Sequence, residues 1–427
     1  MNYEQSLEYL STLNTFGINF GLKRIERLLT LMHNPERRFK TVHVTGTNGK
    51  GSTTAMLTAI LSDCGIKTGM YTSPHLAEYT ERMIVDGIEI TPSAFAEAVH
   101  YTSRFVDQMV GEGWEHPTEF EVLTAAALYY FAAAGVEYAV IEVGMGGLLD
   151  STNVIMPEVA VITNVTLEHT DRCGTTLTEI GRHKAGIIKQ GVPVITAAKG
   201  EALDVIRQTA VAKEAQLYVL GRDFYGHFAG LDGYRQKLVV ETKGQGNIGT
   251  FVLGLLGRHQ IENSSIAVMT ALVLAQREQR ITVQNIASGL AKANWPGRFE
   301  VVAGQPLIII DGAHNPDGAR VLRENLDELF PGKDIVFLLG ILKDKDVTGI
   351  IKNLIRPDNK VVVVAPISER AGEPAEIARE IQAKQVEIAD SIASGIEQVK
   401  TLAGTDGVVC VAGSLYLIGT ARQIICK

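Results

Sequence analysis

The stretch Thr41-Val42-His43-Val44-Thr45-Gly46-Thr47-Asn48-Gly49-Lys50-Gly51-Ser52 decides the fold of this chain. Its first five residues are largely apolar or β-branched and favour a short buried strand, and residues 53–64 carry apolar side chains at helical spacing. Glycines between a strand and a helix let main-chain N–H groups converge on an anion, and the start of the helix adds a favourable dipole. The general phosphate-loop motif has Ser or Thr directly after its lysine, whereas Gly51 separates Lys50 from Ser52 here. The order of strand, glycine-rich turn, lysine, hydroxyl and helix still predicts a nucleotide-phosphate loop, with an ordinary tight turn as the weaker alternative.

Strand-like and helix-like segments alternate along the first 293 residues. Continuous apolar runs without polar alternation are typical of a parallel sheet that is covered on both faces. The segment 217–253 alternates polar and apolar residues and favours a small antiparallel excursion. Further buried strands are predicted at 138–143, 159–165 and 192–196, and helices at 121–134 and 261–277.

A second block of alternating segments follows the stretch Asn294–Arg298, which has the character of a junction. Strands are predicted at 306–310, 335–340, 361–365 and 408–412, with helices such as 318–330 and 374–384 between them. A block of this length can bury a core of its own. We therefore predict an α/β protein of two domains that meet near residues 296–300, the first of them built on a largely parallel sheet.

Composition and charge exclude several classes of function. Hydrophobic residues make up 46% and charged residues 21% of the 427 residues, as in an ordinary globular enzyme. A formal net charge of −8 argues against a nonspecific nucleic-acid binder. The four cysteines are scattered without zinc spacing, and neither a secretory signal nor an apolar membrane span is evident. The expectation is a cytoplasmic protein with neither nucleic-acid nor membrane partners.

Short motifs in a fixed order extend from the phosphate loop to the end of the chain. They include HVTGTNGKGST at 43–53, SPHL at 73–76, ERMIVDG at 81–87, TEFEVLTA at 118–125, EVGMGG at 142–147, LDSTN at 149–153, EHT at 168–170, HKAGIIK at 183–189, GRHQIEN at 257–263, WPGRFE at 295–300, DGAHNP at 311–316, GILKDKD at 340–346 and GSLYL at 413–417. On these motifs the chain resembles folylpolyglutamate synthase and dihydrofolate synthase, which are members of the Mur-ligase-like superfamily. The extra Gly51 supports the resemblance, because GTNGKGS is the form of the loop in this family.

The resemblance implies a P-loop ATP-binding domain at 1–296 and a smaller Rossmann-like α/β domain at 300–427. It also implies an ATP-dependent ligase that joins a carboxylate to an amino acid through an acyl phosphate. The expected small-molecule substrates are L-glutamate and a pterin or folate acid, either dihydropteroate or (tetrahydro)folate or both. ATP and Mg²⁺ are the implied cofactors, and a monomer is expected. The resemblance also implies the residues that bind ATP, namely Thr47, Asn48, Gly49, Lys50, Gly51, Ser52, Asn263, Arg298, Asp311 and His314. An alternative for Arg298 and Asp311 is a mutual ion pair at the domain junction.

The candidate metal ligands combine position in the sheet with the resemblance. Glu142 ends an apolar strand, where ligand sites of α/β sheets gather, and a carboxylate there is hard to explain as core. By resemblance Ser73, Glu142 and His169 bind magnesium, and Lys184 holds a second ion if carbon dioxide carbamylates it. Carbamylation requires a neutral amine, so the site must lower the pKa of the lysine. His183 stands where the family usually has glutamate. Lys50, Lys184 and His169 are the candidate catalytic residues.

The pocket for the acid is where the sequence departs from the family pattern. By resemblance it is lined by Thr118, Phe120, Glu121, Leu149, Asp150 and Ser151. Leu148 replaces the usual arginine, Cys173 lies in a second segment that differs, and Arg172 is a candidate for the missing charge. The changes leave open a ligase for a different carboxylic acid, and a nonligating ATP-binding protein is a third reading. The choice between the two folate activities is also left open.

Overall fold

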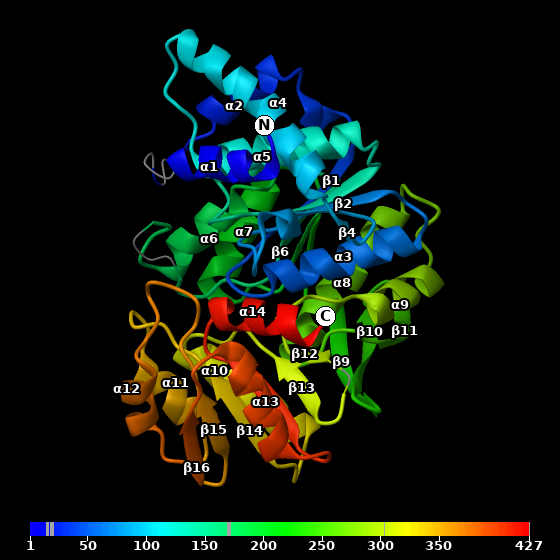
Figure 1. Cartoon of the computed structure of the whole chain (residues 1–427). Helices are drawn as coiled ribbons and strands as arrows, with labels where there is room; N and C mark the ends of the chain where they lie inside the picture. Colours follow the sequence, from blue (N-terminus) through cyan, green and yellow to red (C-terminus); the bar gives the residue numbers. More distant parts are fainter. Residues whose placement is uncertain (14–16, 18–20, 169–171, 303, 427) are drawn as a thin grey trace. The chain divides into compact units, whose positions relative to one another are not determined.

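The chain forms two compact units, each with its own sheet (Figure 1). A computed structural model describes residues 1–13, 17, 21–168, 172–302 and 304–426. The first unit contains Met1–His75, Tyr79–Gly254 and His259–Ala293, and the second contains Leu76–Glu78, Leu255–Arg258 and Asn294–Lys427. In the part of the chain so described, no helix is both long enough and apolar enough to cross a membrane.

The first unit is built on an eight-stranded sheet in the order β4-β3-β2-β5-β1-β6-β7-β8. All neighbouring strands in the part of the sheet ordered β2-β5-β1-β6-β7-β8 are parallel, whereas β3 pairs antiparallel with both β2 and β4. This confirms the predicted largely parallel sheet. The sequence patterns did not predict β2, β3 and β4, which are short. The strands are β1 (Lys40–Thr45), β2 (Thr68–Tyr71), β3 (Met83–Val85), β4 (Ile88–Glu89), β5 (Tyr138–Glu142), β6 (Val159–Ile162), β7 (Val194–Thr196) and β8 (Leu217–Val219).

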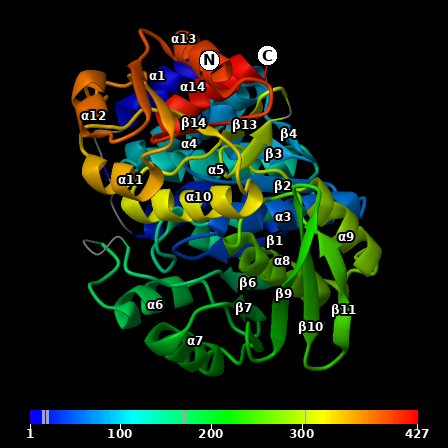
Figure 2. The ribbon, with the colours of Figure 1, turned by 90° about the horizontal axis from the view of Figure 1, so that it is seen from below.

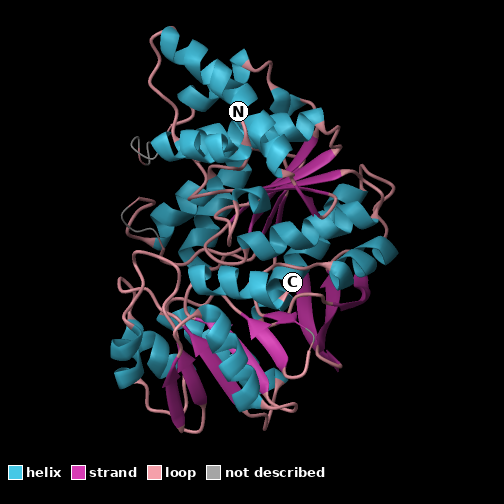
Figure 3. Ribbon diagram, viewed as in Figure 1, coloured by secondary structure: helices cyan, strands magenta, loops and turns pink. Residues whose placement is uncertain are grey.

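Helices cover both sides of this sheet (Figure 3). A large apolar core joins β5 to the N-terminal helices through buried side chains such as Leu28, Phe95, Leu123 and Ile141. Continuous burial explains why β5 and β6 are apolar runs rather than alternating ones, whereas β1 is equally buried from Thr41 onward but carries threonines and a histidine. The helices are α1 (Tyr3–Leu13), α2 (Lys23–Leu31), α3 (Lys50–Asp63), α4 (Pro92–Gly111), α5 (Glu119–Ala133), α6 (Leu177–Ala185) and α7 (Gly200–Ala212), with short 3₁₀ turns at Pro35–Arg37, Tyr79–Arg82 and Ser151–Val154.

The predicted antiparallel excursion is a separate three-stranded sheet in the order β11-β10-β9. Its strands are β9 (Phe224–Asp232), β10 (Arg235–Thr242) and β11 (Gly246–Val252), and α8 (His259–Ala275) and α9 (Val283–Lys292) follow them in the chain. Figure 2 shows α8 beside β9 and α9 beside β11, in agreement with their packing contacts. The start of the predicted segment, Leu217–Val219, instead forms β8 of the parallel sheet.

The second unit has a six-stranded sheet in the order β12-β13-β17-β14-β15-β16. All neighbours are parallel except β12, which pairs antiparallel with β13. Apolar cores lie on both faces, as expected for the predicted Rossmann-like arrangement. The elements are β12 (Glu300–Val302), β13 (Leu307–Ile310), α10 (Pro316–Leu329), β14 (Ile335–Leu339), α11 (Val347–Leu354), β15 (Lys360–Val363), α12 (Pro374–Glu380), β16 (Gln385–Ile388), α13 (Ile392–Ala403), β17 (Val408–Ala412) and α14 (Leu415–Ile425).

Two predicted helix boundaries are wrong. Helix α3 begins at Lys50 rather than at residue 53, because Gly49 with φ 83° ends the turn and allows the helix to start at once. Helix α12 ends at Glu380 rather than at residue 384, and Gln385–Ile388 continues as an edge strand. Both errors place an element end about three residues from its position, because periodicity alone does not locate caps.

Candidate active site

The phosphate loop connects the central strand β1 to helix α3, and two of its glycines are sterically required. A Cβ on Gly46 would lie 1.8 Å from Oγ1 of Thr163, and a Cβ on Gly49 would lie 2.2 Å from Oδ1 of Asn263. The backbone of the loop therefore packs directly against side chains from two other elements. This close approach leaves the loop amides at the carboxyl edge of the sheet, where a phosphate can accept from them.

Lys50 lies across this loop. Its Nζ donates to the carbonyl oxygens of Gly46 and Thr47, at 3.0 Å in both cases. The ammonium group is therefore held within one turn of the loop amides. A compact positive charge in this position can neutralise the outer phosphates of a nucleotide.

The segment after β6 holds the other side of the loop. The main-chain N–H of Thr47 donates to the carbonyl of Asn164 (3.0 Å), and the N–H of Asn48 donates to its Oδ1 (2.9 Å). Thr163 Oγ1 donates to the carbonyl of Asn48 at 2.6 Å, and the N–H of Thr166 donates to Thr47 Oγ1 at 3.0 Å. Sequence reasoning missed these positions. The only available signal was their place after a buried strand, beside the EHT motif.

Helix α8 supports the loop through two amides. Gln260 is fully buried and donates from Nε2 to Ser52 Oγ at 3.2 Å, while Asn263 Nδ2 donates to Gln260 Oε1 at 3.0 Å. The predicted ATP-binding residue Asn263 therefore touches the loop at Gly49. Gln260, which was not predicted, orients both Asn263 and Ser52.

Glu142 ends β5, next to β1 in the sheet, and is 4% exposed. Its Oε2 accepts from the main-chain N–H of Ser73 at 3.3 Å, so two of the predicted metal ligands lie together. A carboxylate and a hydroxyl are the hard oxygen donors that Mg²⁺ prefers, and this pair fits such an ion.

The third predicted ligand, His169, lies outside the described residues. Among the residues that are described, no three His, Cys, Asp or Glu side chains gather in one place. The fit to magnesium therefore rests on Glu142 and Ser73.

Lys184 belongs to α6 and is 3% exposed. Burial, and then the positive charge of Lys50, lower its pKa from the ordinary 10.5 to about 7, while Glu168 acts in the opposite direction. An amine with this pKa is largely neutral above neutral pH, which is the form that reacts with carbon dioxide. The influence of Lys50 also shows that Lys184 and the phosphate loop belong to one electrostatic site.

The predicted acid-binding residues on α5 divide into two kinds. Thr118 caps the helix, and Glu121 completes a capping box, accepting from the N–H of Thr118 at 2.7 Å and from Arg24 Nε at 3.2 Å. Phe120 is half-buried, and its ring stacks on that of Tyr71 with the centroids 6.3 Å apart. A Cβ on Gly144 would lie only 2.6 Å from Cζ of Phe120. Phe120 is therefore the least buried of these three side chains.

The segment 144–153 begins two residues after Glu142. Asp150 is buried and accepts from the N–H of Met145 (2.8 Å) and of Thr152 (3.0 Å). Burial raises the pKa of Asp150, and these hydrogen bonds lower it. Leu148 and Leu149 are 41% and 39% exposed, and the N–H of Leu148 donates to the carbonyl of His183 at 2.8 Å. The position that departs from the family pattern is therefore attached to the helix of Lys184.

Comparison with known proteins agrees with this geometry. Residues 44–271 match the Mur ligase middle domain, and residues 297–415 match the glutamate ligase domain of Mur ligases. A folylpolyglutamate synthase of Lacticaseibacillus casei is 37% identical over 431 residues, which cover 100% of this chain and 99% of the relative. The chain belongs to the folylpolyglutamate and dihydrofolate synthase family of Mur ligases. It is an ATP-dependent ligase.

Solved structures of this ligase family share the whole fold. The crystal structure of a Thermotoga maritima folylpolyglutamate synthase aligns with a TM-score of 0.90 at 32% identity, covering 100% of this chain and 97% of that one. A Mycobacterium tuberculosis folylpolyglutamate synthase complexed with ADP and AMPPCP aligns with a TM-score of 0.86 at 29% identity, covering 100% and 99%. The predicted α/β fold class is thereby confirmed.

The remaining candidate nucleotide ligands of the ligase belong to its second unit, with Arg298 just before β12 and with Asp311 and His314 after β13. Asp311 follows β13 and accepts from the main-chain N–H groups of Phe299 and Ala313, at 2.8 Å each. Burial raises the pKa of Asp311, and the charge of Arg298 lowers it. Nδ1 of His314 donates to the carbonyl of Gly312 at 2.7 Å, so in the neutral ring Nε2 is the nitrogen without a proton. Arg298 is exposed.

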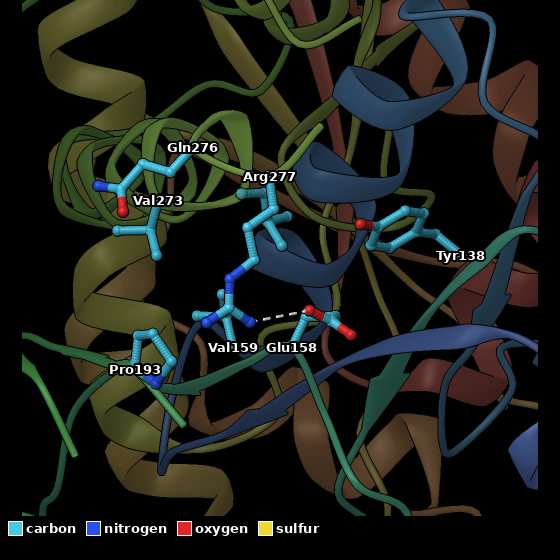
Figure 4. A pocket seen from close by; sticks show the side chains of 8 residues that line it. Tyr138, Glu158, Val159, Pro193, Val273, Gln276 and Arg277 are labelled. Carbon is cyan, nitrogen blue, oxygen red and sulfur yellow. Dashed lines mark hydrogen bonds and ion pairs between the residues drawn. The ribbon is translucent and has the colours of Figure 1, made fainter. Parts of the chain in front are cut away.

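The opposite edge of the ligase's large sheet carries a small pocket that belongs to none of these groups (Figure 4). It is lined by residues at the amino ends of β5, β6 and β7 and at the end of α8, and Arg277 pairs with Glu158 across it at 3.3 Å. Ligand sites of parallel sheets lie at the carboxyl ends of strands. We therefore assign the active site to the edge that carries Lys50, Glu142 and Lys184.

Proposed function

We propose that this ligase adds L-glutamate to dihydropteroate, to a reduced folate, or to both. The proposal rests on one observation: the phosphate loop, Glu142 and Lys184 lie at one edge of the sheet. The positive charge of Lys50 in this loop contributes to the lowered pKa of Lys184. Relatives named folylpolyglutamate synthase and dihydrofolate synthase support the choice of substrates.

The residues have distinct tasks in such a reaction. The loop amides and Lys50 hold the nucleotide phosphates, so that the γ-phosphoryl group faces the acid carboxylate. Transfer forms an acyl phosphate, which the amine of glutamate attacks with release of phosphate. Catalysis of this kind depends on positioning and on neutralising phosphate charge. Magnesium, when bound by Glu142 and Ser73 with His169, would supply charge neutralisation at the phosphates.

Further assignments complete the proposal. Asn263 in the first unit and Arg298, Asp311 and His314 in the second are proposed nucleotide contacts, and Lys184 is a proposed metal ligand when carbamylated. Thr118, Phe120, Glu121, Leu149, Asp150 and Ser151 are proposed to form or shape the acid pocket. We further propose ATP-binding and ligase roles for 1–296 and 300–427, a monomeric state and a cytoplasmic location.

A second candidate function follows from Leu148. Its exposed side chain stands where the family usually places an arginine, and leucine offers no charge to an acid substrate. The alternative is therefore a ligase that joins an amino acid to a less anionic or more apolar carboxylic acid.

A phosphate-release assay decides between the two. The enzyme is incubated with ATP, Mg²⁺ and L-glutamate, together with dihydropteroate, with tetrahydrofolate, or with a panel of other aromatic and aliphatic acids. We expect turnover with at least one pterin acid and a product heavier by one glutamate in mass spectrometry. Turnover with another acid and with neither pterin would replace the first proposal by the second. ATP binding without turnover on any acid would contradict both.

A further inference from the structure

One face of β1, the strand that leads into the phosphate loop, carries a row of polar side chains. Successive residues of a strand point to opposite faces, so Thr41, His43 and Thr45 share one face while Val42 and Val44 share the other. All five side chains are at most 1% exposed. The strand is central in the sheet, with His43 opposite Ile141 of β5 and Ala160 of β6. A polar row at such a depth is unusual, because buried polar groups lower stability unless they are hydrogen-bonded.

Each member of this row bonds to the same distant segment. Thr45 Oγ1 donates to the carbonyl of Gly146 at 2.7 Å, and Thr41 Oγ1 donates to the carbonyl of Met156 at 3.4 Å. Between them, His43 Nε2 lies 2.9 Å from Thr152 Oγ1. The three contacts follow one another in order, so the segment 146–156 runs along β1 in the opposite direction. We call Thr41, His43, Thr45 and Thr152 the polar ladder.

The central contact of the ladder has a defined direction. Thr152 Oγ1 donates its only proton to Asp150 Oδ1 at 2.5 Å, so it must accept from His43. Nε2 of His43 therefore carries the proton. Burial, and then the charge of Lys189, lower the pKa of His43 to about 3, which keeps the imidazole neutral. Its Nδ1 is buried and has no hydrogen-bond partner among the described residues.

Stability alone does not account for this arrangement. An apolar residue of similar volume at position 43 would pack against the sheet without leaving a buried nitrogen unpaired. The polar ladder instead fixes the position of the segment 146–156 relative to β1. It ties the segment that contains Leu148, Leu149, Asp150 and Ser151 to the strand whose end forms the phosphate loop.

We propose that His43 and Thr152, with Thr45, are positioning residues that set the acid-binding segment at a fixed distance from the phosphate loop. The chain His43 to Thr152 to Asp150 fixes the turn at 145–150, and the Thr45 contact fixes its start. The acid carboxylate is thereby aligned with the γ-phosphoryl group, although none of the ladder side chains touches a substrate. This inference rests on the proposed function of the 146–156 segment.

Matched substitutions test the ladder. Thr152→Val removes the hydroxyl and keeps the shape, whereas Thr152→Ser keeps the hydroxyl. His43→Leu removes the donor, and His43→Gln retains an N–H at a similar reach. Thr102→Val is the control, because Thr102 is equally buried but donates only to Ala98 of its own helix. Steady-state kinetics are measured for the acid and for ATP, together with the dissociation constant of the acid and the melting temperature.

We expect Thr152→Val and His43→Leu each to lower kcat/KM for the acid about tenfold, with KM for ATP within about twofold of wild type. Thr152→Ser and His43→Gln should recover most of the loss, and Thr102→Val should change only the melting temperature. The double variant His43→Leu with Thr152→Val should be no less active than the less active of the two single variants, because both substitutions remove the same His43–Thr152 hydrogen bond. If Thr152→Val does not fold, Thr45→Val tests the neighbouring contact in the same way.

Two results would overturn the inference. One is a wild-type enzyme that turns over its acid while all ladder variants keep its kinetics and lose only melting temperature, which would make the ladder purely structural. The other is an equal loss in the serine and glutamine variants. A wild-type enzyme without turnover on any acid would instead remove the proposed function, and the inference with it.

Discussion

Two loops leave the same edge of the same sheet, from neighbouring strands, and they are stabilised in different ways. The loop after β1 is held through its backbone, by glycines that allow close approach and by carbonyls that accept from Lys50. The segment after β5 is held by side chains, through Asp150, Thr152 and the row on β1. Backbone contacts of this kind require one short motif, whereas side-chain contacts can vary in sequence. The comparison predicts that substitutions in the loop after β1 act through steric clashes and that substitutions in the segment after β5 act through lost hydrogen bonds.

The largest effect is expected at the amine of the phosphate loop. Lys50→Met should lower kcat by about 100-fold or more, since it removes a charge that is aimed at the transferred phosphoryl group. Phosphate release under saturating ATP measures it. The control Lys67→Met removes an exposed lysine just beyond the end of α3 and should leave the rate unchanged. Near-normal turnover by Lys50→Met would show that the loop does not bind the reacting phosphates.

The end of β5 should be nearly as sensitive. Glu142→Gln keeps the shape but removes the charge of the proposed magnesium ligand, and we expect about a 100-fold loss of activity together with a higher Mg²⁺ requirement. Titration of activity with Mg²⁺ separates the two effects. Glu137→Gln, just before the start of the same strand, is the control, because its partner is the surface residue Arg280. Equal Mg²⁺ dependence in both variants would remove Glu142 from the metal site.

A glycine of the phosphate loop provides a purely steric comparison. Gly49 and Gly65 both have positive φ, 83° and 70°, but only Gly49 has a neighbour where a Cβ would stand. Gly49→Ala should raise KM for ATP about tenfold, because the new methyl group displaces Asn263 or the loop. Gly65→Ala should cost about 1 kcal/mol of stability and leave KM for ATP unchanged. Similar kinetics for the two variants would mean that the Gly49 contact does not shape the nucleotide site.

The last prediction concerns stability rather than turnover, and it is a dependence of the free energy of unfolding on pH. The pKa of Lys184 is about 7 in the folded chain against an ordinary 10.5, so above pH 7 the unfolded chain binds more protons than the folded one. The free energy of unfolding should therefore rise with pH between about 7 and 10 relative to Lys184→Met, by at most about 1.4 kcal/mol per pH unit. Urea unfolding at pH 6.5, 7.5 and 8.5, with chelator and without bicarbonate, measures it. If the free energy of unfolding changed with pH in the same way for both proteins, the amine of Lys184 would be protonated at these pH values and could not react with carbon dioxide.

Local patterns were sufficient for most of the fold. The apolar runs of β5, β6 and β7 predicted a parallel sheet because strands buried on both faces leave no polar alternation, and β1 was predicted from its β-branched residues before the glycine-rich turn. These patterns failed for β2, β3, β4 and β16, for which no strand was predicted, and the helix predicted at 374–384 extended past the end of α12 at Glu380. Helix starts were displaced by two or three residues, both after Gly49 and after the side-chain caps Thr118 and Asn315, because periodicity does not locate caps.

The sequence predicted those residues of the candidate site whose position follows from their own motif. Lys50 and Glu142 follow their strands directly, so position in a parallel sheet was enough to place both at one edge. Gln260, Asn164 and Thr163 could not be inferred in this way, because each contacts the loop from a segment more than 100 residues away in the chain.

By itself the sequence determined the energy source, the order of the elements and the family of this ligase, since a phosphate loop and a buried strand are specified by neighbouring residues. Only the tertiary structure decided what His43 does. The motif alone indicates that His43 is a polar residue in a strand. His43 donates to Thr152 only because residues 146–156 pack along β1. A contact between two segments depends on the register of both, and no single segment of the sequence contains that register.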